Sequence, residues 1–465
     1  MNRRFSVTLL LALTGCISAP PPPDAGIAPP ATYRYATDGA PGDAVTDDWW
    51  RRFGSDELDR LIARAATGNY DVAAALARVR EARANARIAG AALYPSVDGF
   101  VDASRQAGFS VNDNLPSGNA FSFGVSASYE LDLWGRNRAL RDSALASAHA
   151  SEFDRATVTI MVTAEVANTW LQTVALRERE QIAGANLQTA QRLLGVVESQ
   201  LQAGFATPID AARQRTVVAA QQREVAQLRQ QANDSEAALA ILLGVPASRF
   251  TIDTRSLANV QAPPIDAGLP SSLITRRPDV AGNEARLAAV HADVAAARAA
   301  MLPSVTLTAY AGTGSDRAVR IFDNPLYSLA AGLTAPIFNA GSLAASRDLA
   351  VAQQEEMLAA YRQSIVAAFT DVERALNASA GVDAQTVALD SELLAARRTL
   401  QLAESRYRAG AATSLDVLDA QRTLYAVEDE QVQLRLARLQ AAVSLYRALG
   451  GGWRNTGSTS LRVDH

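Results

Sequence analysis

The stretch Phe121-Ser-Phe-Gly-Val-Ser-Ala-Ser-Tyr-Glu-Leu-Asp-Leu133 alternates apolar and polar residues along its whole length. Its odd positions are apolar, and its even positions are serine, glycine, glutamate or aspartate. Successive side chains of a β-strand point to opposite faces of a sheet, so this period of two predicts a strand with one apolar and one polar face. The stretch is also long enough to cross a membrane as a tilted strand.

Three weaker alternating stretches predict three more strands. The four expected strands span residues 96–105, 121–133, 304–312 and 326–338. Segments rich in Gly, Asn, Asp and Ser, at 108–119 and 312–324, separate the members of each pair and are typical of surface loops. Alternation alone fits a half-buried soluble sheet equally well. The choice between a soluble sheet and a membrane barrel therefore depends on other parts of the chain.

The chain matches itself at an offset of about 206 residues, which indicates two halves made by duplication. Gly204-Phe-Ala-Thr-Pro-Ile-Asp210 returns as Gly410-Ala-Ala-Thr-Ser-Leu-Asp416. We expect a first structural repeat over 49–260 and a second over 261–465, each with two strands followed by a helical hairpin. The expected hairpins span residues 136–243 and 342–449, and a C-terminal segment follows the second.

Two very long helices are expected, because no proline occurs from Ser117 to Thr207 or after Pro336. They run from near residue 135 to 203 and from near 342 to 409, about 100 Å each at 1.5 Å per residue. A 3,4 spacing of apolar residues predicts a coiled-coil seam in the first of them. The expected seam consists of Leu187, Ala190, Leu194, Val197 and Leu201.

The returning helices of the two hairpins are shorter than their partners by about 30 residues. Helices near 71–92 and 278–302 would fill that difference. The Gly- and Pro-containing segment 245–270, together with the chain before Asp71 and after Gly450, would then form a mixed belt around the middle of the helical part.

The composition and motifs of the chain argue against nucleic-acid binding, metal binding and catalysis. The hydrophobic share is 48% but the aromatic share is only 6%, which favours close-packed, alanine-rich helices. A net charge of -4 gives no basis for binding nucleic acid. The 3 histidines and the 1 cysteine lie far apart in sequence, so we expect neither a metal site nor a disulfide. Neither a catalytic triad nor a phosphate loop is present, so we expect no enzyme and no cofactor.

The N-terminus is typical of a secretory signal. Arg3 and Arg4 precede an apolar run too short to span a bilayer, and Leu13-Thr-Gly-Cys16 follows. This tetrapeptide resembles the lipobox of bacterial lipoproteins. The resemblance implies a signal peptide over 1–15, N-acyl and S-diacylglyceryl groups on Cys16, and a proline-rich linker over 16–48. Ile17 is not the aspartate associated with retention at the inner membrane, so we expect an outer-membrane protein.

An outer-membrane location favours a barrel, and the barrel must be shared between chains. Four strands cannot span lipid alone, because an open sheet edge is not tolerated there. Two chains would give eight strands, whose interior needs larger side chains than the Ser, Gly, Thr and Asp found here. Three chains give twelve strands and twelve helical columns around a lumen of about 25 to 30 Å. Such an object is a duct.

Across nearly the whole mature chain the sequence resembles the TolC-type outer membrane factors, specifically the NodT/OprM-like lipoprotein efflux channels. The resemblance lies in an ordered set of short motifs: Trp49-Trp50, Asn69-Tyr70-Asp71, Arg276-Arg277-Pro278-Asp279, Ala335-Pro336-Ile337-Phe338 and the turns at Gly204 and Gly410. It implies a homotrimer in the outer membrane with a 12-stranded barrel, a periplasmic α-barrel and an equatorial belt. We read Trp49, Trp50, Arg276 and Arg277 as structural residues of that belt.

The resemblance also implies a function and partners. The channel would be a passive duct for drugs and toxic amphiphiles, joined to a periplasmic adaptor and an inner-membrane RND-type pump. Two alternatives remain open. One is the outer-membrane duct of a type I protein secretion system with an ABC transporter, and the other is a non-conducting lipoprotein that tethers the envelope.

The two hairpin turns hold the most testable positions. Glycine, threonine and aspartate at this spacing predict a helix end followed by a capped helix start, and the resemblance makes the turns the contacts for the adaptor. These residues are Gly204, Thr207, Pro208, Asp210, Gly410 and Thr413. Family members close the tunnel at positions that match Asp416, Asp419 and Tyr407. Ala412 replaces the arginine that joins this aperture in some members, which departs from the family pattern.

Overall fold

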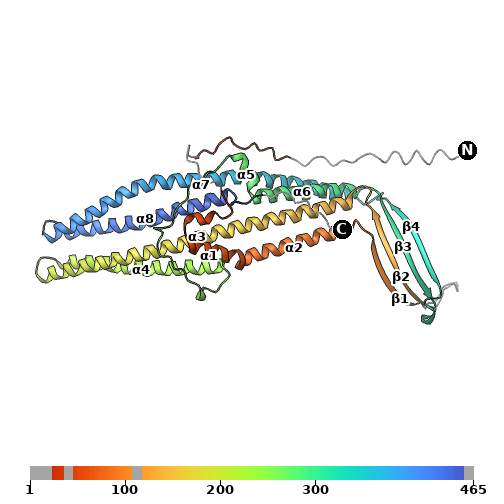
Figure 1. Ribbon diagram of the computed structural model, residues 1–465, viewed down its shortest axis with the longest axis horizontal. Helices are drawn as coiled ribbons and strands as arrows, with labels where there is room; N and C mark the ends of the chain where they lie inside the picture. Colours follow the sequence, from red (N-terminus) through yellow and green to blue (C-terminus); the bar gives the residue numbers. More distant parts are fainter. Residues whose placement is uncertain (1–23, 36–44, 107–117, 455–465) are drawn as a thin grey trace. The chain divides into compact units, whose positions relative to one another are not determined.

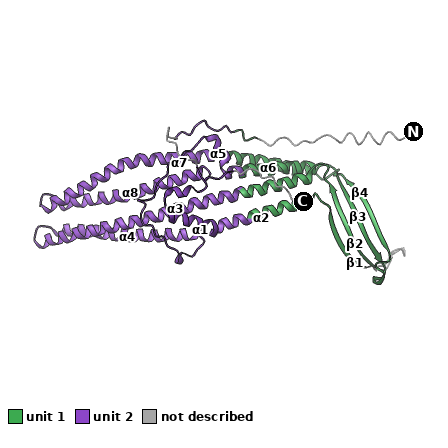
Figure 2. Cartoon of the chain, in the orientation of Figure 1, with its two compact units in different colours: residues 1–26, 78–152, 282–362 green, residues 27–77, 153–281, 363–465 purple. Residues whose placement is uncertain are grey.

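The computed structural model describes residues 24–35, 45–106 and 118–454. Cys16, the lipobox and most of the first expected loop lie outside these residues. The chain divides into two compact units, shown in Figure 2. Unit 1 comprises residues 1–26, 78–152 and 282–362, and unit 2 comprises residues 27–77, 153–281 and 363–465.

Unit 1 contains a four-stranded antiparallel sheet in the order β1-β2-β3-β4. The strands are β1 (Ser96–Gln106), β2 (Gly118–Leu131), β3 (Ser304–Ser315) and β4 (Pro325–Thr334). The central pair, β2 and β3, joins the two halves of the sequence. Its register sets Val125 beside Ala311 and Ser126 beside Tyr310. The apolar residues of β2 therefore line one face of the sheet and its serines and glycine the other, as the alternation predicts, although Tyr310 of β3 lies on the serine side.

The predicted ends of three strands were wrong. We expected strands over 121–133, 304–312 and 326–338, but β2 ends at Leu131, β3 at Ser315 and β4 at Thr334. Asp132 leaves the strand because its carboxylate accepts the backbone N–H groups of Asn137 and Arg138, each at 3.0 Å, at the start of the next helix. Pro336 has no N–H to donate to a sheet, so the alternation around it does not continue β4.

The helices repeat with equal lengths in the two halves. The long helices are α3 (Arg136–Gln202) and α7 (Ser342–Arg408), 67 residues each, and the returning helices are α4 (Pro208–Leu242) and α8 (Ser414–Ala448), 35 residues each. Both expected hairpins are confirmed to within a residue or two (Figure 1). The expected filler helices are α2 (Tyr70–Ala91) and α6 (Pro278–Ala299). No described helix is both long and apolar enough to cross a membrane.

The predicted coiled-coil seam was only partly right. Ala190 and Val197 are buried, but Leu187, Leu194 and Leu201 are only partly buried. The buried stripe instead runs through Ala183, Asn186, Ala190, Leu193 and Val197. The stripe shifts because α3 packs against more than its hairpin partner: Leu193 and Val197 share one cluster with Leu393 of α7 and Leu424 of α8.

Unit 2 also contains the belt, which we define as residues 45–69, 245–277 and 449–454. It includes the short helices Trp49–Phe53, α1 (Asp56–Gly68), Ala247–Arg249 and α5 (Pro270–Arg276). Trp49 is 1% exposed, and its ring stacks on Tyr446 of α8 with centroids 4.8 Å apart. The expected packing role of Trp49 is confirmed.

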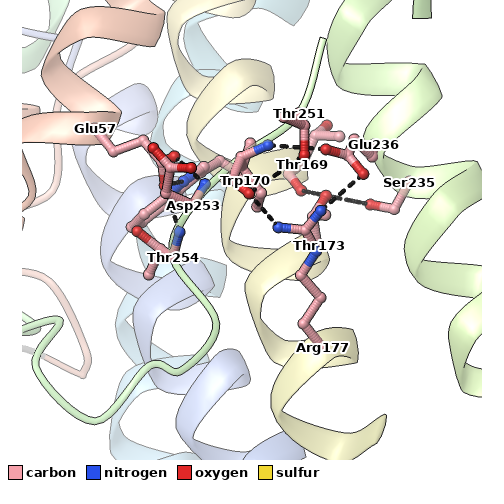
Figure 3. A network of polar contacts seen from close by, with 11 residues as sticks. Glu57, Thr169, Trp170, Thr173, Arg177, Ser235, Glu236, Thr251, Asp253 and Thr254 are labelled. Carbon is pink, nitrogen blue, oxygen red and sulfur yellow. Dashed lines mark hydrogen bonds and ion pairs between the residues drawn. The ribbon is translucent and has the colours of Figure 1, made fainter. Parts of the chain in front are cut away.

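A polar network ties the belt to the helices, as Figure 3 shows. The carboxylate of Glu57 accepts the indole N–H of Trp170 at 3.0 Å and the backbone N–H groups of Asp253 and Thr254 at 2.6 and 3.2 Å. Burial opposes the charge, but these donors outweigh it and lower the pKa of Glu57. Nearby, Arg177 of α3 donates to Glu236 of α4 at 2.8 Å.

Arg277 occupies the break between α5 and α6. Its guanidinium donates to Asp279 at 2.6 and 3.0 Å, to Asp371 of α7 at 3.0 Å and to the carbonyl of Ala448 at 3.4 Å. Burial opposes its charge, but the two carboxylates raise the pKa of Arg277 above its ordinary value. The expected structural role is confirmed for Arg277, whereas Arg276 is exposed.

Candidate functional site at the helical tips

The candidate site consists of the two turns that end the hairpins, with the first residues of the helices that follow. We name them the first tip turn (residues 203–210) and the second tip turn (residues 409–416). Gly204 and Gly410 have φ angles of 79° and 73°, a left-handed conformation that favours glycine. Phe205 N–H donates to the carbonyl of Gln200 at 2.8 Å, and Ala411 N–H to that of Arg406, also at 2.8 Å. Each long helix therefore ends at a glycine that reverses the chain.

Each returning helix begins with a complete capping box. In the first tip turn, Thr207 N–H donates to Asp210 Oδ2 at 2.9 Å, and Asp210 N–H donates to Thr207 Oγ1 at 3.4 Å. In the second, Thr413 N–H donates to Asp416 Oδ2 at 2.8 Å, and Asp416 N–H donates to Thr413 Oγ1 at 3.3 Å. The capping roles that the sequence predicts for Asp210 and Asp416 are confirmed.

A side-chain hydrogen bond joins the two turns. The hydroxyl of Ser414 donates a hydrogen bond to Asp210 Oδ1, across 204 residues of sequence. This bond and those from Thr207 lower the pKa of Asp210, so its carboxylate stays ionised well below neutral pH. Sequence reasoning missed Ser414. The available signal was that it occupies the position of Pro208, where the second turn departs from the first.

The predicted aperture residues do not form one cluster. Tyr407 is 9% exposed; burial, and then the negative charge of Asp210, raise its pKa. Asp416 is exposed, and its carboxylate takes part in the capping box. The backbone and side-chain hydrogen bonds from Thr413 lower the pKa of Asp416. Asp419 lies exposed on the second turn of α8. Within one chain the structure brings together Tyr407, Asp210 and Ser414, and leaves Asp419 facing solvent.

Large apolar side chains are exposed at the tips. Phe205 is 86% exposed, and Ile209 and Leu415, which occupy equivalent positions of the two repeats, are 57% and 56% exposed. Exposed apolar groups around a polar turn are typical of a surface that another protein covers. The role of Gly204, Thr207, Pro208, Asp210, Gly410 and Thr413 as adaptor contacts stays a prediction.

Comparison with known proteins gives the family. The model of the family described as outer membrane efflux protein matches residues 61–245 and 269–451, which are the two repeats. The chain is 49% identical to the pyoverdine export outer membrane protein OpmQ of Pseudomonas putida, over 96% of each chain. It is 32% identical to the cation efflux system protein CusC of Escherichia coli O6:H1, over 96% of this chain and 97% of CusC.

Solved structures agree with the sequence comparison. The outer-membrane channel OprN matches with a TM-score of 0.86 and 30% identity, over 93% of this chain and 99% of the OprN chain. The match extends over both the sheet and the helical hairpins of this chain. Both units described above therefore have counterparts in the OprN channel.

Proteins of this family are trimeric outer-membrane channels that work with a periplasmic adaptor and an inner-membrane pump in tripartite efflux systems. The expected fold class, the efflux function, the partners and the outer-membrane location with a periplasmic helical part are thereby confirmed. Since the family model covers both repeats and the relatives match over nearly the full length, this chain belongs to the outer membrane efflux protein family.

Proposed function

We propose that this protein is a passive duct for small molecules, and that a siderophore of the pyoverdine type is its cargo. The proposed cargo rests on one observation. The chain is 49% identical to a pyoverdine exporter over 96% of both chains, but only 32% identical to a cation efflux protein. A lumen of about 25 to 30 Å discriminates poorly between solutes. The inner-membrane pump, which we infer to be of the RND type, therefore selects the cargo.

The sheet explains how three copies make the duct. Among the described residues, the outer edges of β1 and β4 have no partner strand, and lipid does not tolerate unpaired backbone groups. Three copies of four strands pair edge to edge and close a ring of twelve. The apolar face of the sheet then contacts lipid, and its serine- and glycine-rich face lines the lumen.

We propose that carboxylates at the helical tips restrict the periplasmic entrance. Asp416 is committed to its capping box. Asp419 is exposed one turn further along α8, and three copies of it around a narrow axis would bind cations and repel one another. The bond from Ser414 to Asp210 joins the tips of the two hairpins of one chain, near Ala412, which replaces the arginine found in some relatives.

We also propose that the chain has no catalytic activity of its own. Among the described residues there is no group of three or more His, Cys, Asp and Glu side chains placed to hold a metal ion. Near the belt, Arg177 and Glu236 are engaged in hydrogen bonds to the backbone of Ile252 that fix this segment onto α3 and α4. A duct needs no reacting group, and transport energy comes from the pump.

The cargo is tested by replacing OpmQ in Pseudomonas putida with this protein and measuring pyoverdine in the medium by mass spectrometry. We expect export to return to most of the level of the parent strain, because the adaptor and pump remain in place. CusC expressed in the same way is the control and should restore little. Pyoverdine that stays inside cells, although the protein is present in the outer membrane and crosslinks to the adaptor, would contradict the cargo.

The gate is tested by Asp419→Ala in a planar lipid bilayer. Removing three carboxylates from the entrance should raise single-channel conductance severalfold. Glu430→Ala is the matched control, because Glu430 is exposed on nearly the same face of α8 three turns away. If the Asp419→Ala channel and the unmodified channel have equal conductance, Asp419 does not restrict the entrance.

The two capping aspartates form a natural matched pair for testing the contact between the tips. Asp416→Ala should speed amide hydrogen exchange about fivefold, and only in the second tip turn, because it removes one cap. Asp210→Ala should speed exchange in both turns, because it removes a cap and the acceptor of Ser414. If Asp210→Ala speeds exchange only around residue 207, the hydrogen bond between the turns does not stabilise the second tip turn.

We propose that Cys16 carries the N-acyl and S-diacylglyceryl groups that anchor the protein. The chain has 1 cysteine, so Cys16→Ser should abolish metabolic labelling with radioactive palmitate and prevent cleavage before residue 16. Ser18→Ala, two residues away, should keep both. An unmodified protein whose mature N-terminus is not residue 16 would refute the lipid anchor.

A further inference from the structure

Two aromatic rings lie together on the polar face of the sheet. Phe100 of β1 and Tyr310 of β3 have ring centroids 5.4 Å apart and ring planes inclined by 31°. The two strands are separated by β2, so the side chains meet over the middle of three adjacent strands. Both rings are only partly covered, although neither belongs to the core, the belt or the tips.

Glycines in the strands beneath make room for the rings. Phe100 pairs in register with Gly124, and Gly124 pairs with Gly312. A Cβ atom on Gly124 would lie 3.1 Å from Phe100 Cζ, and one on Gly312 would lie 2.8 Å from the hydroxyl oxygen of Tyr310. The rings therefore lie across the sheet instead of projecting from it, and each has a side turned away from the backbone.

The face that holds the rings is the one that lines the duct. The opposite face presents Val101, Phe123, Val125 and Leu307, which are between 39% and 75% exposed in the single chain. Large exposed apolar side chains on one face of a membrane sheet contact lipid. Phe100 and Tyr310 therefore belong to the wall of the lumen, where solutes pass.

Negative charge accompanies the rings. Asp98 and Asp102 stand two residues before and after Phe100 in β1 and share its face. Arg105, the single basic residue in the four described strands, falls on the opposite face by the same alternation. An electron-rich aromatic surface beside carboxylates attracts cations that are themselves planar and aromatic.

We propose that Phe100 and Tyr310 form a stacking shelf in the duct wall that binds planar aromatic cations, with Asp98 and Asp102 supplying the counter-charge. The inference rests on the proposed function, because it needs the polar face to line an export duct. Three copies of the chain would carry three shelves. Weak, repeated contacts suit a duct, since a solute has to bind well enough to enter and weakly enough to leave.

The test measures current blocks by ethidium, a planar aromatic cation, added to the extracellular side of channels in a planar bilayer. Tetraethylammonium, a cation without an aromatic ring, is the comparison at equal concentration. The unmodified channel should show ethidium blocks that tetraethylammonium does not produce. The double variant Phe100→Leu with Tyr310→Leu should weaken ethidium binding about tenfold, within the range for the loss of aromatic stacking partners.

Two further variants separate the shelf from a merely structural pair that covers glycines. Phe123→Leu removes a ring from the lipid face of β2 and should leave the block unchanged. Asp98→Asn with Asp102→Asn keeps both rings and should weaken the ethidium block severalfold, most at low salt.

Ethidium binding that is unchanged in the double leucine variant, or equal block by tetraethylammonium, would overturn the shelf. An unchanged block in the asparagine variant would overturn the role of the two carboxylates, even if the leucine variant failed to fold. Ordinary salt conductance distinguishes these outcomes from failure of the duct: an unmodified channel that carries no ions would refute the proposed function itself.

Discussion

An unpaired strand edge cannot remain in the hydrocarbon of a membrane, and the rest of this structure depends on that constraint. In the part of the chain that the structure describes, the sheet has two such edges, on β1 and β4. Each edge needs a partner strand, and only other copies of the chain provide one. In the membrane, the four-stranded sheet is therefore one subunit of a barrel. Three copies give twelve strands, and a barrel of that size encloses a lumen.

The duplication is the second organising feature, and its departures from symmetry matter more than its regularities. The two halves produce helices of 67 and 35 residues with the same capping boxes. They differ where Pro208 of the first turn is replaced by Ser414 in the second, and the serine hydroxyl bonds the first turn's Asp210. A single substitution between the copies thus supplies a hydrogen bond between their tips.

Unit 2 is held unequally along its length. Around the belt, the Trp49–Tyr446 stack and the buried contacts of Glu57, Arg177 and Arg277 fix several segments at once. At the tips the capping boxes are exposed, and one hydrogen bond joins the turns. Next to the turns, Ala211, Tyr407 and Val417 belong to one buried apolar cluster. The belt is therefore fixed by polar contacts together with the aromatic stack, and the helices near the tips by apolar packing.

Local rules were enough to locate most elements from the sequence. Proline, glycine and the capping residues set the ends of the long helices, because each acts on its own neighbours in the chain. The same rules failed where a distant or competing partner intervened. Asp132 left β2 to cap α3, and the buried stripe of α3 shifted to Leu193 because the helix has neighbours in both hairpins.

The sequence by itself determined the strands, the hairpins, the capped turns and the resemblance that gives the family, since all of these are written in residues close together along the chain. Only the tertiary structure decided which residues meet across it. Asp210 and Ser414 are 204 residues apart, and Phe100 and Tyr310 belong to different repeats. Such contacts are fixed by strand register and helix packing, and no local pattern encodes them.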